Sequence, residues 1–189
     1  PGVSPSNNGQ AGPLPFQDHT FTTLYADPPW PEVGGGRIVR GAQAHYPLMR
    51  VPDIWNMGPE VMRVAAPNSH LYLWSTNNYL PTAILCMEHW GFRYITTVTW
   101  LKDRFGLGQY FRGNTEHCLF GVRGTVPYKL IDSKRAQGVT GFMATRQEHS
   151  EKPHDMREMI QHVSYPPFLE LFARRHAPGW SAWGAEITP

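Results

Sequence analysis

The chain has 189 residues, of which 41% are apolar, and this is enough to build one core of ordinary domain size. Its 17 lysines and arginines stand against 15 acids, so the net charge of +2 does not indicate a nucleic-acid partner, and any such contact must come from local clusters. Two cysteines cannot form a disulfide framework, and no segment approaches the ~18 apolar residues of a membrane span. Composition therefore excludes disulfide-stapled and membrane-spanning folds and favours a reducing compartment.

Residues 1–20 are rich in Pro, Gly, Ser and Asn and lack the charged and apolar regions of a signal peptide. They are interpreted as a flexible tail or as the cut end of a longer protein. Residues 21–189 are then expected to form a single domain.

The apolar pattern predicts strands and helices in alternation. Residues 21–26 form a short, β-rich, apolar run that stops at Asp27, and the glycines that follow predict a loop. Residues 51–66 have helical spacing with a break at Gly58-Pro59, and residues 78–90 form a helix ended by Gly91. Further strands are expected at 70–74, 94–100, 116–122 and 167–174, a helix at 154–162, and a long basic loop at 124–150.

Alternating strands and helices predict an α/β fold with a Rossmann-like, mostly parallel sheet flanked by helices. Ligands in such sheets bind beyond the carboxyl ends of the strands. Asp27 and Arg174 both fall at such ends, so the beginning and the end of the chain are expected to meet in one site.

Asp27-Pro28-Pro29-Trp30 directly follows the first strand. Proline fixes φ and has no amide hydrogen, so the two prolines predict a rigid elbow that holds the Asp27 carboxylate beside the Pro28 carbonyl. Trp30 adds a flat apolar face suited to stacking on a ring.

Two acceptors next to an aromatic face match a ligand whose amino group is attached to an aromatic ring, as in adenine or cytosine. Such acceptors can draw the nitrogen toward tetrahedral geometry and free its lone pair for attack on an electrophile, which suits amino methylation of a flipped-out base. The alternative is a proline-rich turn in which Asp27 caps the next segment and Trp30 packs in the core, and the sequence does not decide between the two.

Other motifs point away from other chemistries. Gly106 to Gly113 lacks the spacing of a dinucleotide fingerprint, the histidines form no metal-ligand pattern, and no metal is expected. Tyr46 is a candidate for lining the target pocket. The basic candidates for phosphate contacts lie in two loops, with solvated loop charge as the equal alternative for each: Arg37, Arg40, Lys129, Lys134, Arg135 and Arg146.

Seven blocks in order carry a resemblance to a known family: "ADPPW", "HYPLM", "HLYLW", "TWLK", "EHCLFGVRG", "HSEKP" and "LELFAR". They resemble the S-adenosylmethionine-dependent adenine-N6 methyltransferases related to the catalytic subunit of the eukaryotic mRNA-adenosine methyltransferase. The resemblance covers most of residues 21–186. It implies a Rossmann-like fold in permuted order, with the catalytic motif before the cofactor motif, and members that act on DNA or RNA.

The resemblance implies roles for individual residues. Asp27, Pro28, Pro29 and Trp30 would hold the target adenine, with Asp27 also near the methyl donor. Lys152 would pair with the methionine carboxylate of S-adenosylmethionine, or alternatively be a solvated lysine before a helix. Four further residues would lie near the ribose and adenine of the cofactor: Glu170, Phe172, Arg174 and His176. Glu170 would face a polar ligand or else bond Arg174.

The resemblance also has departures. Ala185 stands where many relatives have Asn after "WG", and Glu186 is a candidate replacement for the contact to the ribose. An acidic cofactor contact upstream of the catalytic motif has only Asp18 as a candidate.

The sequence therefore predicts adenine-N6 methylation of nucleic acid, with DNA slightly favoured over RNA, in the cytoplasm of a bacterial or phage-host cell or in a eukaryotic nucleus. A catalytically silent subunit of the same fold is the alternative, and a homo- or hetero-oligomer is left open.

Overall fold

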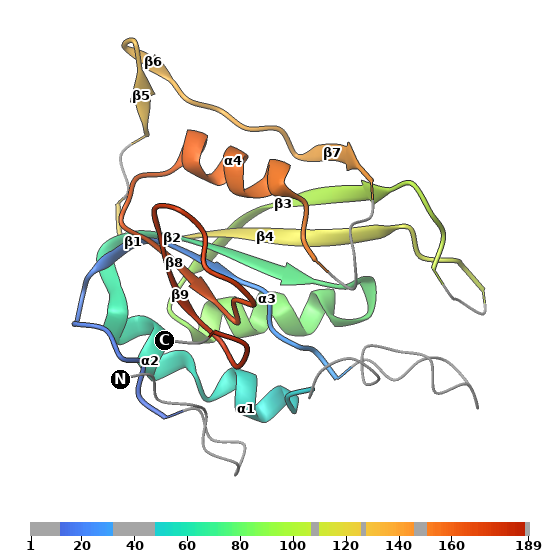
Figure 1. Cartoon of the computed structure of the whole chain (residues 1–189), viewed down its shortest axis with the longest axis horizontal. Helices are drawn as coiled ribbons and strands as arrows, with labels where there is room; N and C mark the ends of the chain where they lie inside the picture. Colours follow the sequence, from blue (N-terminus) through green and yellow to red (C-terminus); the bar gives the residue numbers. More distant parts are fainter. Residues whose placement is uncertain (1–11, 32–47, 107–109, 126–127, 146–150, 188–189) are drawn as a thin grey trace.

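A computed structural model describes residues 12–31, 48–106, 110–125, 128–145 and 151–187. Its centre is a seven-stranded sheet in the order β7-β3-β4-β2-β1-β8-β9, with a separate two-stranded hairpin, β5-β6 (Figure 1). The strands are β1 (Phe21–Ala26), β2 (Ala65–Ser75), β3 (Arg93–Lys102), β4 (Thr115–Arg123), β5 (Leu130–Ile131), β6 (Lys134–Arg135), β7 (Gly141–Ala144), β8 (Phe168–Leu171) and β9 (Trp180–Trp183).

Every strand pairing in the large sheet is parallel except the two that β4 makes with β2 and β3. The sheet is therefore mixed but mostly parallel, as the alternation of elements predicts. The carboxyl ends of β1, β2, β3 and β8 consequently lie along one edge of the sheet, and β4 begins at that same edge.

Helices cover both faces of the sheet (Figure 1). On one face lie α1 (Val51–Trp55), α2 (Gly58–Val64) and α3 (Leu80–His89), which follows the short 3-10 helix η2 (Asn77–Tyr79); α4 (His154–Val163) covers the other. Alternate residues of β1 and β2 face the two layers: Leu24 and Leu71 pack in the cluster with the first group, whereas Tyr25 and Tyr72 pack with α4. Within the described residues, no helix is long and apolar enough to cross a membrane.

The predicted helix boundaries are confirmed where local chemistry defines them. The chain leaves α1 before Gly58-Pro59, and Pro59 occupies the first turn of α2, where its missing amide hydrogen costs nothing. Gly91 follows α3 with φ +83°, a left-handed conformation that glycine adopts without a steric penalty.

Three predicted boundaries are corrected. The helix expected over 51–66 ends at Val64, and the strand expected at 70–74 begins at Ala65 as β2. The strand expected at 167–174 ends at Leu171, because Phe172 turns the chain with φ +61°. The expected loop at 124–150 contains β5, β6 and β7, and β7 pairs with β3 to extend the large sheet. Met143 in β7 is 77% exposed, so this edge strand lacks the apolar pattern that identifies a buried one.

The predicted N-terminal tail is wrong for residues 12–20. Leu14 is 2% exposed and belongs to the core, and its amide donates to Glu60 at 2.8 Å. Arg63 holds the same segment by donating to the carbonyls of Leu14 and Phe16 and to the Asp18 carboxylate. Asp18 is thus engaged in an ion pair with Arg63, while residues 1–11 lie outside the described residues.

Candidate active site

The carboxyl ends of β1 and β8 bring the two ends of the chain together. Ala26 pairs with Leu171 in the parallel ladder, and the Asp27 amide then donates to the Leu171 carbonyl at 3.4 Å. Asp27 therefore leaves the sheet at the edge where ligands of parallel sheets collect.

The Asp27-Pro28-Pro29-Trp30 elbow is fixed by the backbone that follows it. The Trp30 amide donates to the Pro28 carbonyl at 2.8 Å, and the Met49 amide donates to the Pro29 carbonyl at 3.0 Å. The Pro28 carbonyl thus already accepts one hydrogen bond within the turn, although a carbonyl oxygen can accept two. Its contact with a substrate amine stays a prediction.

Trp30 has the packing of a core residue. It is 5% exposed, its indole nitrogen donates to the Trp74 carbonyl at 2.9 Å, and its ring stacks on Tyr79 with a centroid separation of 5.5 Å. This arrangement matches the alternative in which the tryptophan packs in the core. Stacking of Trp30 on a target base remains untested.

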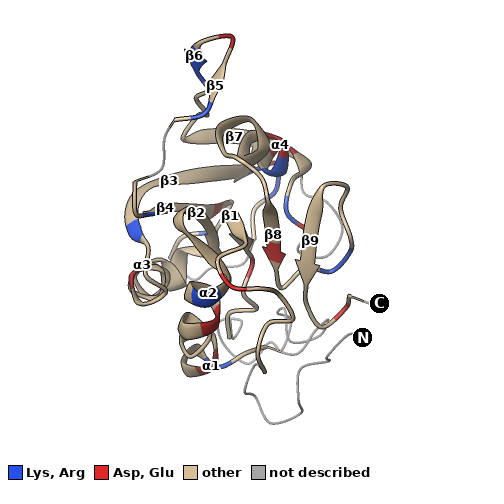
Figure 2. Cartoon of the chain, turned by 90° about the vertical axis from the view of Figure 1, so that its left-hand side faces the viewer, with Lys and Arg blue, Asp and Glu red and all other residues tan. Residues whose placement is uncertain are grey.

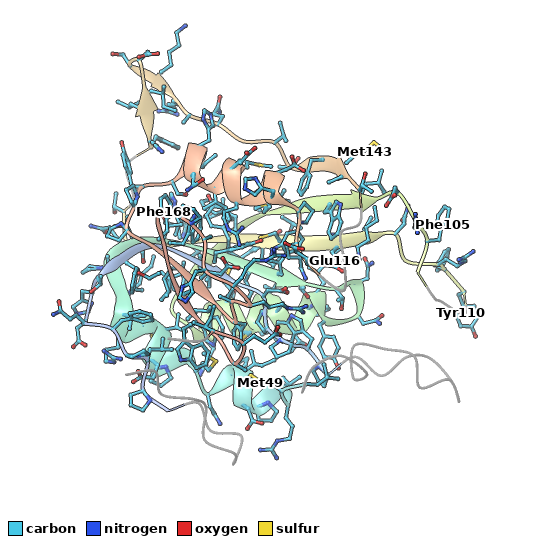
Figure 3. The ribbon with its side chains drawn as sticks, viewed as in Figure 1. Met49, Phe105, Tyr110, Glu116, Met143 and Phe168 are labelled. Carbon is cyan, nitrogen blue, oxygen red and sulfur yellow. The ribbon has the colours of Figure 1, made fainter. Side chains whose placement is uncertain are left out.

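Lys152 joins Asp27 to a second acid. Its Nζ lies 2.8 Å from Asp27 Oδ2 and 3.2 Å from Glu116 Oε2, and Glu116 also pairs with Lys102 (Figure 3 labels Glu116). These four side chains come from the end of β1, the end of β3, the start of β4 and the segment before α4. They form a network with two positive and two negative groups, which we call the charge cluster.

Burial and charge act in opposite directions on the pKa values of the charge cluster. Burial raises the pKa of Asp27 above its ordinary value, although the Lys152 ammonium lowers it. Burial lowers the pKa of Lys152, but the carboxylates of Asp27 and Glu116 outweigh that effect and raise it. For Glu116, burial raises the pKa and the two lysines outweigh it, so the pKa is lowered. Lys152 is consequently held as a cation.

Of the two alternatives for Glu170, the structure does not have the bond to Arg174. The Glu170 carboxylate accepts from Arg157 of α4 at 2.7 Å, because β8 ends at Leu171 and the turn at Phe172 carries Arg174 elsewhere. Burial raises the pKa of Glu170, although the guanidinium of Arg157 lowers it. Contact of Glu170 with a ligand stays a prediction.

The other predicted cofactor residues lie in and after the turn that follows β8. The Phe172 ring contacts Trp183 edge to face at 5.7 Å, and Arg174 Nε lies 3.9 Å from Glu186 Oε1. Gly184 packs so closely on Ala173 that an added Cβ would overlap the Ala173 carbonyl oxygen. The turn and the C-terminal segment are thereby held together, and the exposed His176 belongs to the same turn.

The described basic residues among those predicted for phosphate contacts, Lys129, Lys134 and Arg135, do not lie at this edge. Lys129 donates to the Ser164 carbonyl at 3.2 Å and to that of Gln161, so it binds the end of α4. Lys134 and Arg135 lie on the β5-β6 hairpin, which follows β4 where Arg123 pairs with Ser69 near the start of β2 (Figure 2). That is the amino edge, opposite Asp27. Four predicted residues lie outside the described residues: Arg37, Arg40, Tyr46 and Arg146.

Sequence reasoning missed Lys102 and Glu116 as members of the site. Both lie inside blocks that carry the family resemblance, "TWLK" and "EHCLFGVRG". Beyond the resemblance, these two blocks served only to place strands, and Lys102 and Glu116 had no predicted role. A signal was present, since an acid and a lysine at the ends of two adjacent strands cannot both be buried without partners.

A mostly parallel sheet of this topology, with an acid, a proline elbow and a half-buried lysine at its carboxyl edge, defines a Rossmann-like protein of the methyltransferase class. The chain belongs to the MT-A70 family, whose model matches residues 21–186. This is a family of N6-adenine methyltransferases.

Several proteins to which the chain is similar are named as methyltransferases or methyltransferase subunits. The chain is 29% identical over 189 residues to the Type II methyltransferase M.MunI of Mycoplasma sp, covering 88% of this chain and 78% of that protein. It is 26% identical over 182 residues to the human N(6)-adenosine-methyltransferase catalytic subunit METTL3, covering 88% of this chain and 28% of the relative. It is also 28% identical over 153 residues to the non-catalytic subunit METTL14 of Drosophila melanogaster, covering 72% of this chain and 38% of the relative. The chain thus spans well under half the length of these two eukaryotic relatives.

Proposed function

We propose that this protein transfers a methyl group from S-adenosylmethionine to the 6-amino group of adenine in nucleic acid. The observation that carries the proposal is the pairing of Asp27 with Lys152 at 2.8 Å, at the edge where β1 and β8 end side by side. Family membership supports the reaction class, and this geometry supplies the groups that the reaction needs at one place.

The charges of Lys152 and Asp27 are complementary to those of S-adenosylmethionine. The donor's methionine part carries a carboxylate, which suits Lys152, and a cationic sulfonium and amine, which suit an acid such as Asp27. An ammonium has three N–H donors, and the ion pairs with Asp27 and Glu116 engage two of them. Phe172, Arg174, His176, Glu170 and Glu186 would lie toward the nucleoside part. The permuted order, with Asp27 before these residues, belongs to the same proposal.

When bound, S-adenosylmethionine supplies an electrophilic methyl group whose bond to sulfur breaks as the bond to N6 forms. Asp27 and the Pro28 carbonyl would accept hydrogen bonds from the two N6 hydrogens and so orient the lone pair toward the methyl group. The nitrogen becomes positively charged as it is alkylated and must lose one proton, and the Asp27 carboxylate would be the group placed to accept that proton. Pro29 would keep the elbow rigid, and Trp30 would hold one side of the target pocket.

DNA is the favoured substrate. The type II methyltransferase of Mycoplasma is matched over 78% of its length. The family that the sequence resembles has bacterial members that act on DNA. The relatives named for adenosine or RNA methylation are matched over a smaller share of their length, 28% for the human subunit. RNA remains the alternative substrate for the same chemistry.

Transfer of labelled methyl from S-adenosylmethionine to single-stranded DNA, duplex DNA and RNA of matched sequence tests the proposal, with the product nucleoside identified. We expect N6-methyladenine, and its loss in Asp27→Ala while cofactor binding persists. Label on another base, or near-normal turnover in Asp27→Ala, would contradict the proposed reaction.

A catalytically silent subunit is the second candidate, because the family includes a relative named as a non-catalytic subunit. The complete Asp27-Pro28-Pro29-Trp30 motif and the Lys152 ion pair argue against it. A protein that binds nucleic acid but neither binds S-adenosylmethionine nor transfers methyl would support the silent subunit.

A further inference from the structure

An arm with exposed aromatic rings extends from the carboxyl edge of the sheet between β3 and β4. Its described parts are residues 103–106 and 110–114, which we call the aromatic arm. Tyr110 is 94% exposed, Phe111 92% and Phe105 62%. Figure 3 shows Phe105 and Tyr110 at the right-hand side of the molecule, away from its centre, where Glu116 is labelled. Large exposed rings gathered at one place are typical of a binding surface.

The two sides of the aromatic arm are joined by hydrogen bonds. The Gly106 amide donates to the Gly113 carbonyl at 2.6 Å, and the Lys102 amide donates to the Asn114 carbonyl at 2.7 Å. Arg112 Nε donates to the Gly106 carbonyl at 3.1 Å, and its guanidinium lies 5.5 Å from the centre of the Phe105 ring. Backbone hydrogen bonds between the two sides of the arm therefore hold the rings in place, and this lowers the entropy cost of ordering them on a ligand.

The base of the aromatic arm is part of the proposed active site. Lys102 is the last residue of β3 and Glu116 is the second residue of β4, and these two residues form an ion pair. Glu116 also pairs with Lys152, which pairs with Asp27. The aromatic arm therefore starts from the residues that contact Lys152 and Asp27, and a strand leaving the proposed active site along this edge of the sheet would meet the arm.

Charge on the aromatic arm favours a polyanion as the occupant. Arg104 is 80% exposed and lies 3.9 Å from Asp103, which is the single acid among the arm's described residues. Arg112 lies on the other side of the arm, so the described residues carry two cations and one acid. Aromatic rings interleaved with arginines are the combination that binds single-stranded nucleic acid, because bases stack on the rings and phosphates meet the cations. A paired strand hides the base faces that such stacking requires.

We propose that Tyr110 and Phe111 stack on unpaired bases next to the target adenine, while Arg104 and Arg112 contact the phosphates of the same strand. This inference rests on the proposed function, since it names the form in which that substrate is held. The ligand chemistry is an unpaired nucleic-acid strand, and DNA and RNA strands both supply it.

The test measures binding of fluorescein-labelled single-stranded DNA, single-stranded RNA and duplex DNA to the wild-type protein and to Y110A/F111A. Tyr128→Ala is the matched control, because Tyr128 is 65% exposed but precedes the hairpin at the opposite edge of the sheet. We expect the double variant to bind a single strand at least about tenfold more weakly and the control to bind it normally. S-adenosylmethionine affinity should be unchanged in both.

A second measurement reports stacking itself. A 2-aminopurine placed beside the target adenine should lose fluorescence when it binds the wild-type protein and keep it with Y110A/F111A. The conservative change Phe111→Tyr should retain the quenching. Equal affinity and equal quenching in the wild type and the double variant would overturn the inference. A changed molecular mass by light scattering, with unchanged strand affinity, would also overturn it and assign the arm to protein association.

The two proposals fail in different ways. A wild-type protein that binds and quenches the strand through Tyr110 and Phe111 but transfers no methyl group would support the aromatic arm and contradict the proposed function. Methyl transfer to adenine with the same KM in Y110A/F111A would support the function and overturn the role of the arm.

Discussion

Lys152 donates a hydrogen bond to the Asp27 carboxylate at 2.8 Å, although 125 residues separate them in the chain. One follows the first strand and the other precedes the last helix, so the contact forms only when the whole sheet is assembled. A half-buried ion pair of this kind adds little net stability but fixes the position of both groups, because leaving either charge alone is costly. Asp27 is therefore a carboxylate placed by the fold in a defined orientation.

Replacement of Asp27 by Asn keeps the size of the side chain and removes its charge. We expect kcat for methyl transfer to fall by about 10²-fold or more, because a group that orients the amine and stabilises its developing charge is lost. Binding of S-adenosylmethionine should persist. Kinetics with Asp18→Asn as control measure the effect, since Asp18 pairs with Arg63 in the N-terminal segment. Equal kcat in D27N and D18N would remove Asp27 from the reaction.

Replacement of Lys152 by Met leaves Asp27 and Glu116 without the cation between them. We expect the free energy of unfolding to fall by about 2 kcal/mol, less than for the loss of one partner of a fully buried pair, because water reaches part of both side chains. Affinity for S-adenosylmethionine should fall about tenfold or more. Denaturant unfolding and calorimetry measure the two effects, with Lys134→Met as control because Lys134 is exposed on the hairpin. Unchanged cofactor affinity in a folded K152M protein would contradict the assigned role.

The sequence predicts elements well where the local pattern determines them. The strand that ends at Asp27, the helix break at Gly58 and the left-handed Gly91 follow from turn chemistry and apolar spacing. β7 was missed because an edge strand with exposed alternate residues has little apolar signal. Arg157 as the partner of Glu170 could not be predicted, because it depends on which helix covers β8.

The same distinction holds for the candidate site. The approach of Asp27 to the end of β8 follows from parallel topology, and it could be predicted. The pairing of Lys152 with both Asp27 and Glu116 depends on how three separate segments meet in space, and neighbouring residues do not encode that. The position of Lys134 and Arg135 at the opposite edge follows from the reversed direction of β4, which a mostly parallel interpretation does not reveal.

Replacement of Gly184 by Ala tests the contact between the C-terminal segment and the turn after β8. The added Cβ would overlap the Ala173 carbonyl oxygen and lie 2.8 Å from the Ala173 amide nitrogen, and these backbone atoms cannot rotate away. We expect a loss of about 2 kcal/mol or more in unfolding free energy, within the range for overpacking. Gly12→Ala is the control, because an added Cβ there meets nothing within 4 Å. Equal thermal midpoints for G184A and G12A would show that the segment moves apart freely.

His70 makes the stability of the fold depend on pH. Its ring is buried and bonds Ser164 Oγ at 2.7 Å, and burial lowers the pKa of His70 to about 4. Because the unfolded chain has an ordinary histidine pKa of about 6.5, it binds more protons than the folded protein between these values. The stabilisation that the neutral His70 ring gives to the free energy of unfolding is therefore complete above about pH 6.5, and it is lost as pH falls toward about 4.

Urea unfolding at about pH 5 and about pH 7.5 measures this dependence in the wild type and in His70→Gln, which cannot titrate. The full difference between the two pKa values corresponds to about 3 kcal/mol, and roughly half of it is expected at about pH 5. His70→Gln should flatten the dependence by that amount, whereas the control His162→Gln, on the exposed surface of α4, should leave it as in the wild type. The same pH dependence in H70Q and the wild type would show that another group titrates on unfolding and that the His70 ring accepts a proton in the folded state without cost.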